Sequence, residues 1–148
     1  MTANIHHQLD HVVPSVGVGA MVIRNGNVLL GKRKGSHGAG TYAWCGGGLE
    51  FGESLEGAVA REVFQESGMS VTNISLICVS NIREYGRHYI DFEFEVEAEG
   101  EPLLREPESG EPWTWYPLDD LPHPLFRPVE LAIDSYRKGC EGTIIYNP

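Results

Sequence analysis

Positive charge is scarce in this sequence. Its 11 lysine and arginine residues face 21 aspartate and glutamate residues, which gives a net charge of −10 at pH 7. A chain with this charge repels an extended phosphate backbone, so we expect no nucleic acid polymer among its partners. A small anion can still bind where a divalent cation and a few local basic residues offset the field.

Cysteines and long apolar runs are scarce as well. The three cysteines, Cys45, Cys78 and Cys140, are far apart and form no CxxC pair, which argues against a zinc site or a disulfide framework and favours free thiols in a reducing compartment. No window approaches the roughly 18 apolar residues of a membrane-spanning helix. The first residues have neither the basic start nor the apolar stretch of a secretory signal. We therefore expect a cytoplasmic protein with no membrane partner.

The length of the chain predicts a single domain. With 148 residues, of which 41% are hydrophobic, the chain can bury one core, but two full domains would be cramped. We expect one domain over residues 1–148, with residues 1–14 as a mobile N-terminal segment and residues 139–148 as a tail that can add an edge strand. His6, His7 and His11 lie in the first segment, and we expect them to be mobile rather than metal ligands.

The central feature of the sequence is a glycine-rich loop, Gly46 to Gly48, that leads into a helix. Ser54 can cap the N-terminus of this helix, good helix formers without proline follow it, and Gly68 stands where a glycine commonly ends a helix. The sequence therefore predicts a helix between Ser54 and Gly68.

Two glutamates fall on the apolar side of this helix. At about 100° per residue, one arc of roughly 140° contains six side chains. These are Ala58, Glu62, Leu55, Glu66, Val59 and Val63. A carboxylate on such a stripe is costly to desolvate unless it is paired or bound to a metal. Glu62 and Glu66, one helical turn apart, therefore form a candidate oxygen site for Mg²⁺, whereas we expect Glu56 to be solvated.

Strands are predicted on both sides of the helix. Residues 16–23 form a short apolar run in which Gly17 and Gly19 indicate close approach of another backbone. Asn25-Gly26 is a hairpin signal that leads to a second strand over residues 28–34. Further strands are expected at residues 41–45, 71–82, 88–98 and 113–116, and a last helix from near Pro128 to before Gly139.

The strand at residues 88–98 alternates between apolar and acidic side chains. One face carries Tyr89, Asp91, Glu93, Glu95 and Glu97. We expect most of this face to be solvated, although one member near the start of the strand could reach the metal cluster. At the end of the second strand, Lys32, Arg33 and Lys34 precede a glycine-rich segment and could meet phosphate oxygens.

A known signature resembles the stretch that contains the helix. The Nudix box has the pattern G-x5-E-x7-R-E-U-x-E-E-x-G-U, with U a bulky aliphatic residue. The chain resembles it from Gly47 to Met69 at every specified position except one, where Gln65 replaces a glutamate. Residues 15–138 also look like the branch of this MutT-like family that cleaves nucleoside triphosphates, including oxidised ones. The resemblance implies an α/β fold, the Nudix α/β/α sandwich with a mixed β-sheet and a loop-helix-loop box.

The resemblance also implies roles for individual residues. Glu62 and Glu66 match the positions that bind Mg²⁺ or Mn²⁺, and one of the two is often implicated in activating water. Gly47 matches a glycine whose carbonyl can join the metal shell. Glu53 and Arg61 match the pair that braces the box and complete the catalytic set. The amide of Gln65 offers no charged ligand, which leaves its role in metal binding and the number of metal ions open.

The residues that hold the substrate are less defined by the resemblance. Phe126 and Leu125 match positions near the nucleobase, where an aromatic face suits stacking, and Arg33 is the best candidate for a phosphate contact. Cys45 and Gly48 replace a proline and a histidine that are common in the family. Both changes touch the pocket wall, so the base that binds is not fixed.

We expect the protein to hydrolyse a nucleoside triphosphate to the monophosphate and pyrophosphate. ADP-ribose, other nucleotide sugars and dinucleoside polyphosphates are alternative substrates. A non-catalytic nucleotide sensor is an alternative of another class, against which the retained charges of Glu62 and Glu66 argue. A homodimer is compatible with the apolar, aromatic N-terminal half, but nothing in the sequence fixes the oligomeric state.

Overall fold

The protein is built around a mixed β-sheet. The computed structural model describes residues 13–35, 37–139 and 143–146. Its strands are β1 Ser15–Arg24, β2 Asn27–Lys32, β3 Tyr42–Ala43, β4 Cys45–Gly48, β5 Ser70–Ile82, β6 Tyr89–Glu99, β7 Thr114–Pro117 and β8 Thr143–Tyr146. They follow the order β3-β2-β1-β6-β5-β8, with β4 paired to β1 and β7 paired to β2. β1 is parallel to β6 and β5 to β8, and the other pairs are antiparallel.

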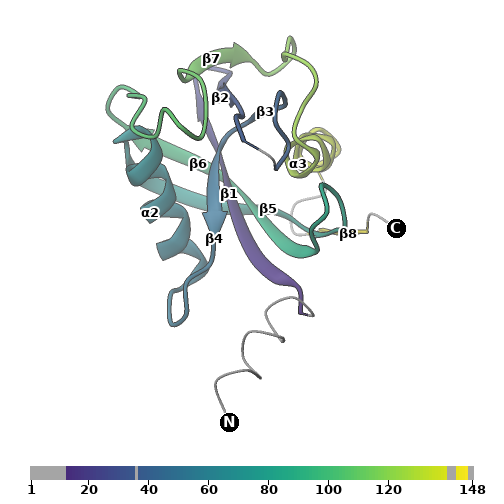
Figure 1. Ribbon diagram of the computed structural model, residues 1–148. Coiled ribbons are helices and arrows are strands. Elements are labelled where there is room, and N and C mark those ends of the chain that lie inside the picture. The colour runs from purple at the N-terminus through teal and green to yellow at the C-terminus, as the bar shows by residue number, and fades with distance from the viewer. Residues whose placement is uncertain (1–12, 36, 140–142, 147–148) are drawn as a thin grey trace.

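Two helices cover opposite faces of this sheet, α2 (Leu55–Ser67) and α3 (Arg127–Arg137), as Figure 1 shows. Successive side chains of a strand point to opposite faces, so Ala20 of β1 packs in the core with α2 and its neighbour Met21 packs in the core with α3. The helices contribute Ala58, Val59 and Val63 to the first core and Val129, Ala132 and Ile133 to the second. The predicted α/β/α sandwich with a mixed sheet is confirmed.

Helix α2 begins and ends where the sequence predicts. The Ser54 hydroxyl accepts a hydrogen bond from the Gly57 amide at 3.0 Å. Gly68 has a φ of 76°, and its amide donates to the carbonyl of Phe64. This left-handed conformation favours glycine and ends the helix. Glu56, in the first turn, is exposed as expected.

The glycine run before α2 is a strand rather than the predicted loop. It forms β4, in which Gly46 lies opposite Gly19 and Gly47 opposite Val18 of β1. A Cβ atom on Gly46 would lie 2.6 Å from the carbonyl oxygen of Val18. Glycine is therefore needed at this position because the two backbones approach too closely for a side chain.

The C-terminal tail adds an edge strand, as expected, because β8 pairs in parallel with β5. Residues 1–12, which make up most of the segment expected to be mobile and include His6, His7 and His11, lie outside the described residues. Among the helices that the structure describes, none combines the length and the apolar character required to span a membrane.

The acidic face of β6 is more buried than predicted. Asp91 is 5% exposed and Glu93 is 2% exposed, whereas Glu97 is exposed. The expectation of a solvated face is therefore wrong for Asp91 and Glu93. The reason is the position of β6 between β1 and β5 in the interior of the sheet, where neighbouring elements cover both faces of the strand.

Candidate active site

The two glutamates on the apolar side of α2 lie against the glycine strand β4. The Gly46 amide points to Glu66 Oε1 at 3.4 Å. A Cβ atom on Gly47 would lie 2.4 Å from Glu62 Oε1, so the absence of a side chain at position 47 leaves room for the Glu62 carboxylate. Glu62 and Glu66 line a cavity of about 490 Å³, which we call the carboxylate cavity.

Arg61 holds this arrangement together. Its Nε and Nη2 each donate to one oxygen of the Glu53 carboxylate at 2.8 Å, a bidentate geometry that fixes the plane of the guanidinium group. Nη1 donates to Glu62 at 2.7 Å, and Nη2 also donates to the Gly48 carbonyl at 2.9 Å. The structure thus brings the predicted brace, Glu53 and Arg61, into contact with both Glu62 and β4.

These carboxyl groups have strongly shifted pKa values. Burial raises the pKa of Glu66 to about 9, and a hydrogen bond with Glu62 and the negative charge of Glu62 act in the same direction. Hydrogen bonds from Arg61 and from the Glu50 backbone lower the pKa of Glu53 to about 2, and Glu53 in turn raises the pKa of Arg61. A pair that resists carrying two negative charges in this way is stabilised by a divalent cation.

The donor set fits Mg²⁺ or Mn²⁺. Within the described ranges, no group of three or more His, Cys, Asp or Glu side chains is placed to hold a metal ion. Mg²⁺ needs fewer protein ligands, because one or two carboxylates combine with water and with phosphates of the substrate. Glu62 and Glu66 supply these two carboxylates. Gln65 is exposed, accepts a hydrogen bond from Arg61 at 3.3 Å and does not line the carboxylate cavity.

The three cations at the end of β2 line the carboxylate cavity together with the glutamates. Lys32, Arg33 and Lys34 all contribute to its wall. The Lys34 ammonium donates to the Pro107 carbonyl at 3.2 Å. Burial lowers the pKa of Arg33, while the nearby Glu66 acts in the opposite direction. Cations and carboxylates that share one cavity are suited to a diphosphate together with its metal ion.

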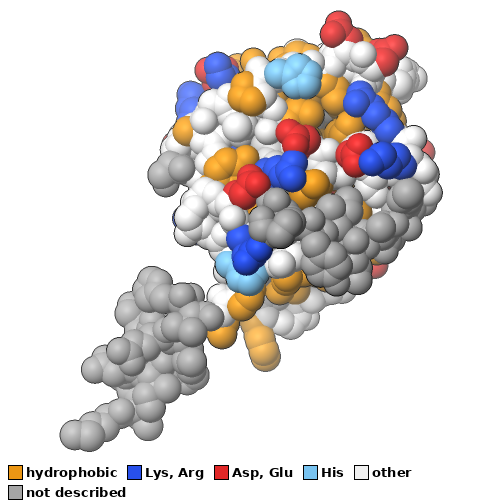
Figure 2. Space-filling view, turned by 90° about the vertical axis from the view of Figure 1, so that its right-hand side faces the viewer, with side chains coloured by type: hydrophobic (Ala, Val, Ile, Leu, Met, Phe, Trp, Pro, Cys, Tyr) orange, Lys and Arg blue, Asp and Glu red, His pale blue; other side chains and the backbone are white. Residues whose placement is uncertain are grey.

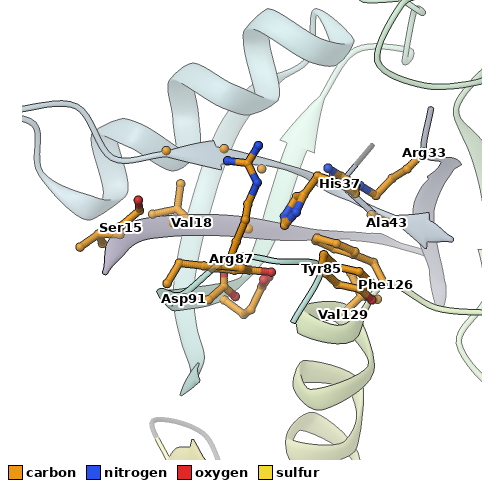
Figure 3. A pocket seen from close by; sticks show the side chains of 18 of the residues that line it. Ser15, Val18, Arg33, His37, Ala43, Tyr85, Arg87, Asp91, Phe126 and Val129 are labelled. Atoms are coloured by element: carbon orange, nitrogen blue, oxygen red, sulfur yellow. The ribbon is translucent and has the colours of Figure 1, made fainter. Parts of the chain in front are cut away.

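A second, larger cavity of about 880 Å³ adjoins the first, and we call it the aromatic cavity. Arg33, His37, Ala43, Trp44 and Gly46 line both. Figure 3 shows His37, Tyr85 and Phe126 gathered in it, with the Tyr85 and Phe126 rings stacked at 5.1 Å and His37 edge-on to Phe126 at 5.4 Å. The size is typical of a small-molecule site, and aromatic walls favour a flat ring.

The structure assigns different places to the residues predicted to hold the substrate. Phe126 lines the aromatic cavity, and the Arg33 guanidinium lies 4.2 Å from the centre of its ring. Leu125 lines neither cavity and packs partly buried against the core with α3. Gly47 lines the aromatic cavity rather than the carboxylate cavity.

Four residues of the aromatic cavity were not singled out from the sequence. His37 and Tyr85 come from segments between strands, and no sequence signal brings these segments together. Asp91 and Glu93 line the floor of the cavity. The sequence does contain a signal for Asp91 and Glu93. They are two residues apart, as Gly17 and Gly19 are, and the parallel register of β1 and β6 places each glycine beside one of the two carboxyl groups.

Comparison with known proteins places the chain in a family. The model of the NUDIX domain matches residues 13–134. The oxidized purine nucleoside triphosphate hydrolase of Danio rerio is 33% identical over 115 residues, which cover 69% of this chain and 65% of the relative. The ADP-ribose pyrophosphatase of Methanocaldococcus jannaschii is 31% identical over 126 residues, 84% of this chain and 74% of the relative.

Longer relatives and solved structures agree with this placement. The NAD-capped RNA hydrolase NudC of Salmonella typhi is 32% identical over 117 residues, 78% of this chain but only 45% of that relative. The crystal structure of a MutT NUDIX hydrolase from Burkholderia pseudomallei is similar with a TM-score of 0.79 and 35% identity, over 83% of this chain and 98% of that one. The chain therefore belongs to the Nudix family of hydrolases.

Proposed function

We propose that this protein hydrolyses a nucleoside triphosphate, including oxidised or otherwise modified ones, to the nucleoside monophosphate and pyrophosphate in a Mg²⁺- or Mn²⁺-dependent reaction. The observation that carries the proposal is the adjacency of the two cavities. One contains paired carboxylates and cations, as a diphosphate with its metal requires, and the other contains aromatic rings, as a base requires. The similarity to an enzyme named for oxidised purine nucleoside triphosphates supports this substrate class.

Each part of the site has a role in this reaction. Glu62 and Glu66 would hold the metal ion, which when bound neutralises charge on the phosphates and lowers the pKa of an attacking water. Arg61, fixed by Glu53, keeps the Glu62 carboxylate in place. Arg33 lies between the glutamates and the aromatic rings, so its guanidinium can hold the phosphates while the base occupies the larger cavity.

The chemistry can be tested with a panel of substrates. The purified protein is incubated with Mg²⁺ and with deoxynucleoside triphosphates, an oxidised purine triphosphate, ADP-ribose, a nucleotide sugar and a dinucleoside polyphosphate, and the products are separated. We expect pyrophosphate and a monophosphate from a triphosphate. If the preferred reaction is instead the conversion of ADP-ribose to AMP and ribose phosphate, the result would favour the activity for which the relative from Methanocaldococcus jannaschii is named. If no substrate gives a product, the result would favour a nucleotide sensor.

The role of the metal-binding pair is tested by Glu66→Gln, with Glu56→Gln as the matched control on the exposed side of the same helix. We expect the first variant to lose at least about 100-fold in rate, the size typical of removing one strong electrostatic contribution, and the second to retain the wild-type rate. Mn²⁺ binding, followed by electron paramagnetic resonance without substrate, should weaken only in Glu66→Gln. Unchanged rate and unchanged Mn²⁺ binding would contradict the proposed role.

The position of attack is tested separately with water labelled with heavy oxygen. We propose attack at the β-phosphorus, which expels the monophosphate and places the label in pyrophosphate. Label in the monophosphate instead would indicate attack at the α-phosphorus and would overturn this part of the proposal alone.

A further inference from the structure

The floor of the aromatic cavity contains a carboxyl group that no described residue satisfies. Asp91 Oδ2 is buried and has no hydrogen-bond partner among the residues that the structure describes. A buried polar atom without a partner costs free energy, and the cost is larger for a charged group. Asp91 also lines the aromatic cavity, so the wall of this cavity contains a carboxyl group with an unsatisfied acceptor.

Glycines on the neighbouring strand create the space around this group. A Cβ atom on Gly17 would lie 3.1 Å from Asp91 Oδ1, and one on Gly19 would lie 2.1 Å from Glu93 Oε2. Any side chain at position 19 would displace the Glu93 carboxyl group. The two glycines thus leave room for the carboxyl groups of Asp91 and Glu93 at the wall of the aromatic cavity.

Asp91 and Glu93 differ in what they can offer a ligand. Trp44 Nε1 donates to Glu93 Oε2 at 2.6 Å, so one oxygen of Glu93 is already occupied. Burial, and then the charge of Asp91, raises the pKa of Glu93 well above its usual range. Burial also raises the pKa of Asp91, while a hydrogen bond from Glu93 acts in the opposite direction. The Trp44 contact and the unpartnered Oδ2 atom leave Asp91 as the member of the pair with an oxygen that can still accept a hydrogen bond.

We propose that Asp91 makes the aromatic cavity selective for a nucleobase with two adjacent N–H donors, the N1–H and 2-amino edge of guanine. A carboxylate only accepts hydrogen bonds and can accept two side by side. In adenine and cytosine an amino group stands next to a ring nitrogen that is itself an acceptor, and in uracil the N3–H stands between two carbonyls. The inference rests on the proposed function in that it names the base of the proposed nucleotide.

Figure 3 shows that Asp91 and the aromatic side chains lie in different parts of the cavity. In this view Asp91 is drawn beside Arg87 and separated from Tyr85 and Phe126, which lie farther along the cavity. The aromatic rings can contact the face of any base, whereas the contact at Asp91 depends on the edge of the base. Because that edge is distant from C8 of a purine, the contact at Asp91 does not distinguish guanine from its C8-oxidised form.

The first test measures binding of nucleoside monophosphates to the wild-type protein by calorimetry, without added metal and without hydrolysis. We expect GMP to bind about 10- to 100-fold more tightly than IMP, which lacks the 2-amino group, because one hydrogen bond to a charged group is lost. AMP and CMP should bind no better than IMP. Equal affinities across the panel would overturn the inference, and they would leave the proposed hydrolysis of triphosphates untouched.

The second test exchanges the acceptor. Asp91→Asn offers one donor and one acceptor, the arrangement that pairs with adenine, so we expect the preference for GMP over AMP to disappear or reverse. Glu93→Gln can still accept from Trp44 and donate to Asp91, and it should retain the preference. Glu97→Gln, exposed on the same strand, is the matched control. A preference that persists in a folded Asp91→Asn protein would also overturn the inference, whereas selective GMP binding without any hydrolysis would contradict only the proposed function.

Discussion

Arg33 connects the two halves of the candidate site through one side chain. Its guanidinium lies 4.2 Å from the centre of the Phe126 ring and donates to the His37 carbonyl at 2.9 Å, and the charge of Glu66 acts on it. A nucleotide has the same order of parts, a flat base followed by phosphates, so a single arginine can contact both the base and the phosphates.

At the same scale, His37 should make stability depend on pH. Burial, and then Arg33 and Arg87, lower the pKa of His37 from 6.5 to about 4. Between these values the unfolded chain binds a proton that the folded protein does not, so the free energy of unfolding should fall as pH falls from 6.5 to about 4. Chemical denaturation at a series of pH values should show a smaller fall for His37→Gln than for the wild type.

The matched control for this prediction is His123→Gln, because His123 is exposed and lines neither cavity. Its stability should follow the wild-type curve over the whole range. Parallel curves for the wild type and His37→Gln would show that His37 is not held neutral by its surroundings.

At the scale of the elements, local signals and long-range pairing differ in what the sequence can predict. Helix α2 was predicted to the residue because its caps, Ser54 and Gly68, act within one turn of the chain. The sequence predicts a loop at the position of β4 because glycine is a poor strand former, and only pairing with β1 makes Gly46 to Gly48 extended. The burial of Asp91 escaped prediction for a related reason, since the alternation of β6 does not reveal which neighbours cover each face.

The same reasoning explains which site residues could be found. Glu53, Arg61, Glu62 and Glu66 form a spaced pattern on one continuous segment, and the structure brings all of them together. The aromatic cavity is instead assembled from β1, β3, β4, β6, two connecting segments and the start of α3. No local pattern encodes that assembly, which is why Tyr85 was missed and Leu125 was expected in a place that the structure does not give it.

Strand β4 leads to a prediction about glycine. In Gly46→Ala the new Cβ atom would lie 2.6 Å from the backbone oxygen of Val18, and backbone cannot move aside as a side-chain end can. We expect a loss of about 1–3 kcal/mol in the free energy of unfolding, the usual range for overpacking, and a fall in Tm of several degrees. Urea denaturation and calorimetry measure both quantities.

Gly48→Ala, two residues along the same strand, is the control for this prediction. No atom lies within 4 Å of the position where its Cβ would stand, so this variant should match the wild type within about 0.5 kcal/mol. If both variants were equally stable, close approach of the two backbones would not be the reason for glycine at position 46.

At the scale of the whole molecule, the arrangement of charge matters more than its sum. The net charge of −10 opposes any anionic ligand, yet Lys32, Arg33 and Lys34 all line the carboxylate cavity. On the face shown in Figure 2, which lies on the side of α3, basic side chains lie beside acidic ones. Salt weakens the field of the net charge at a distance, whereas the cations of the cavity act on a ligand within a few ångströms.

Two charge reversals separate the local field from the total charge. Lys34→Glu and Arg83→Glu change the net charge equally, but only Lys34 lines the carboxylate cavity, while Arg83 is exposed and lines neither cavity. If the protein binds a triphosphate as proposed, Lys34→Glu should raise KM about 10-fold with little change in kcat, because a contact to the phosphates acts equally in the ground state and the transition state. Arg83→Glu should leave KM within about twofold of the wild type, as expected for a screened, distant charge.

Steady-state kinetics at low and high salt measure both effects, and the Lys34→Glu effect should shrink as salt screens the cavity. An equal rise of KM in the two variants would mean that the protein responds to its total charge and that the cations of the cavity have no special role.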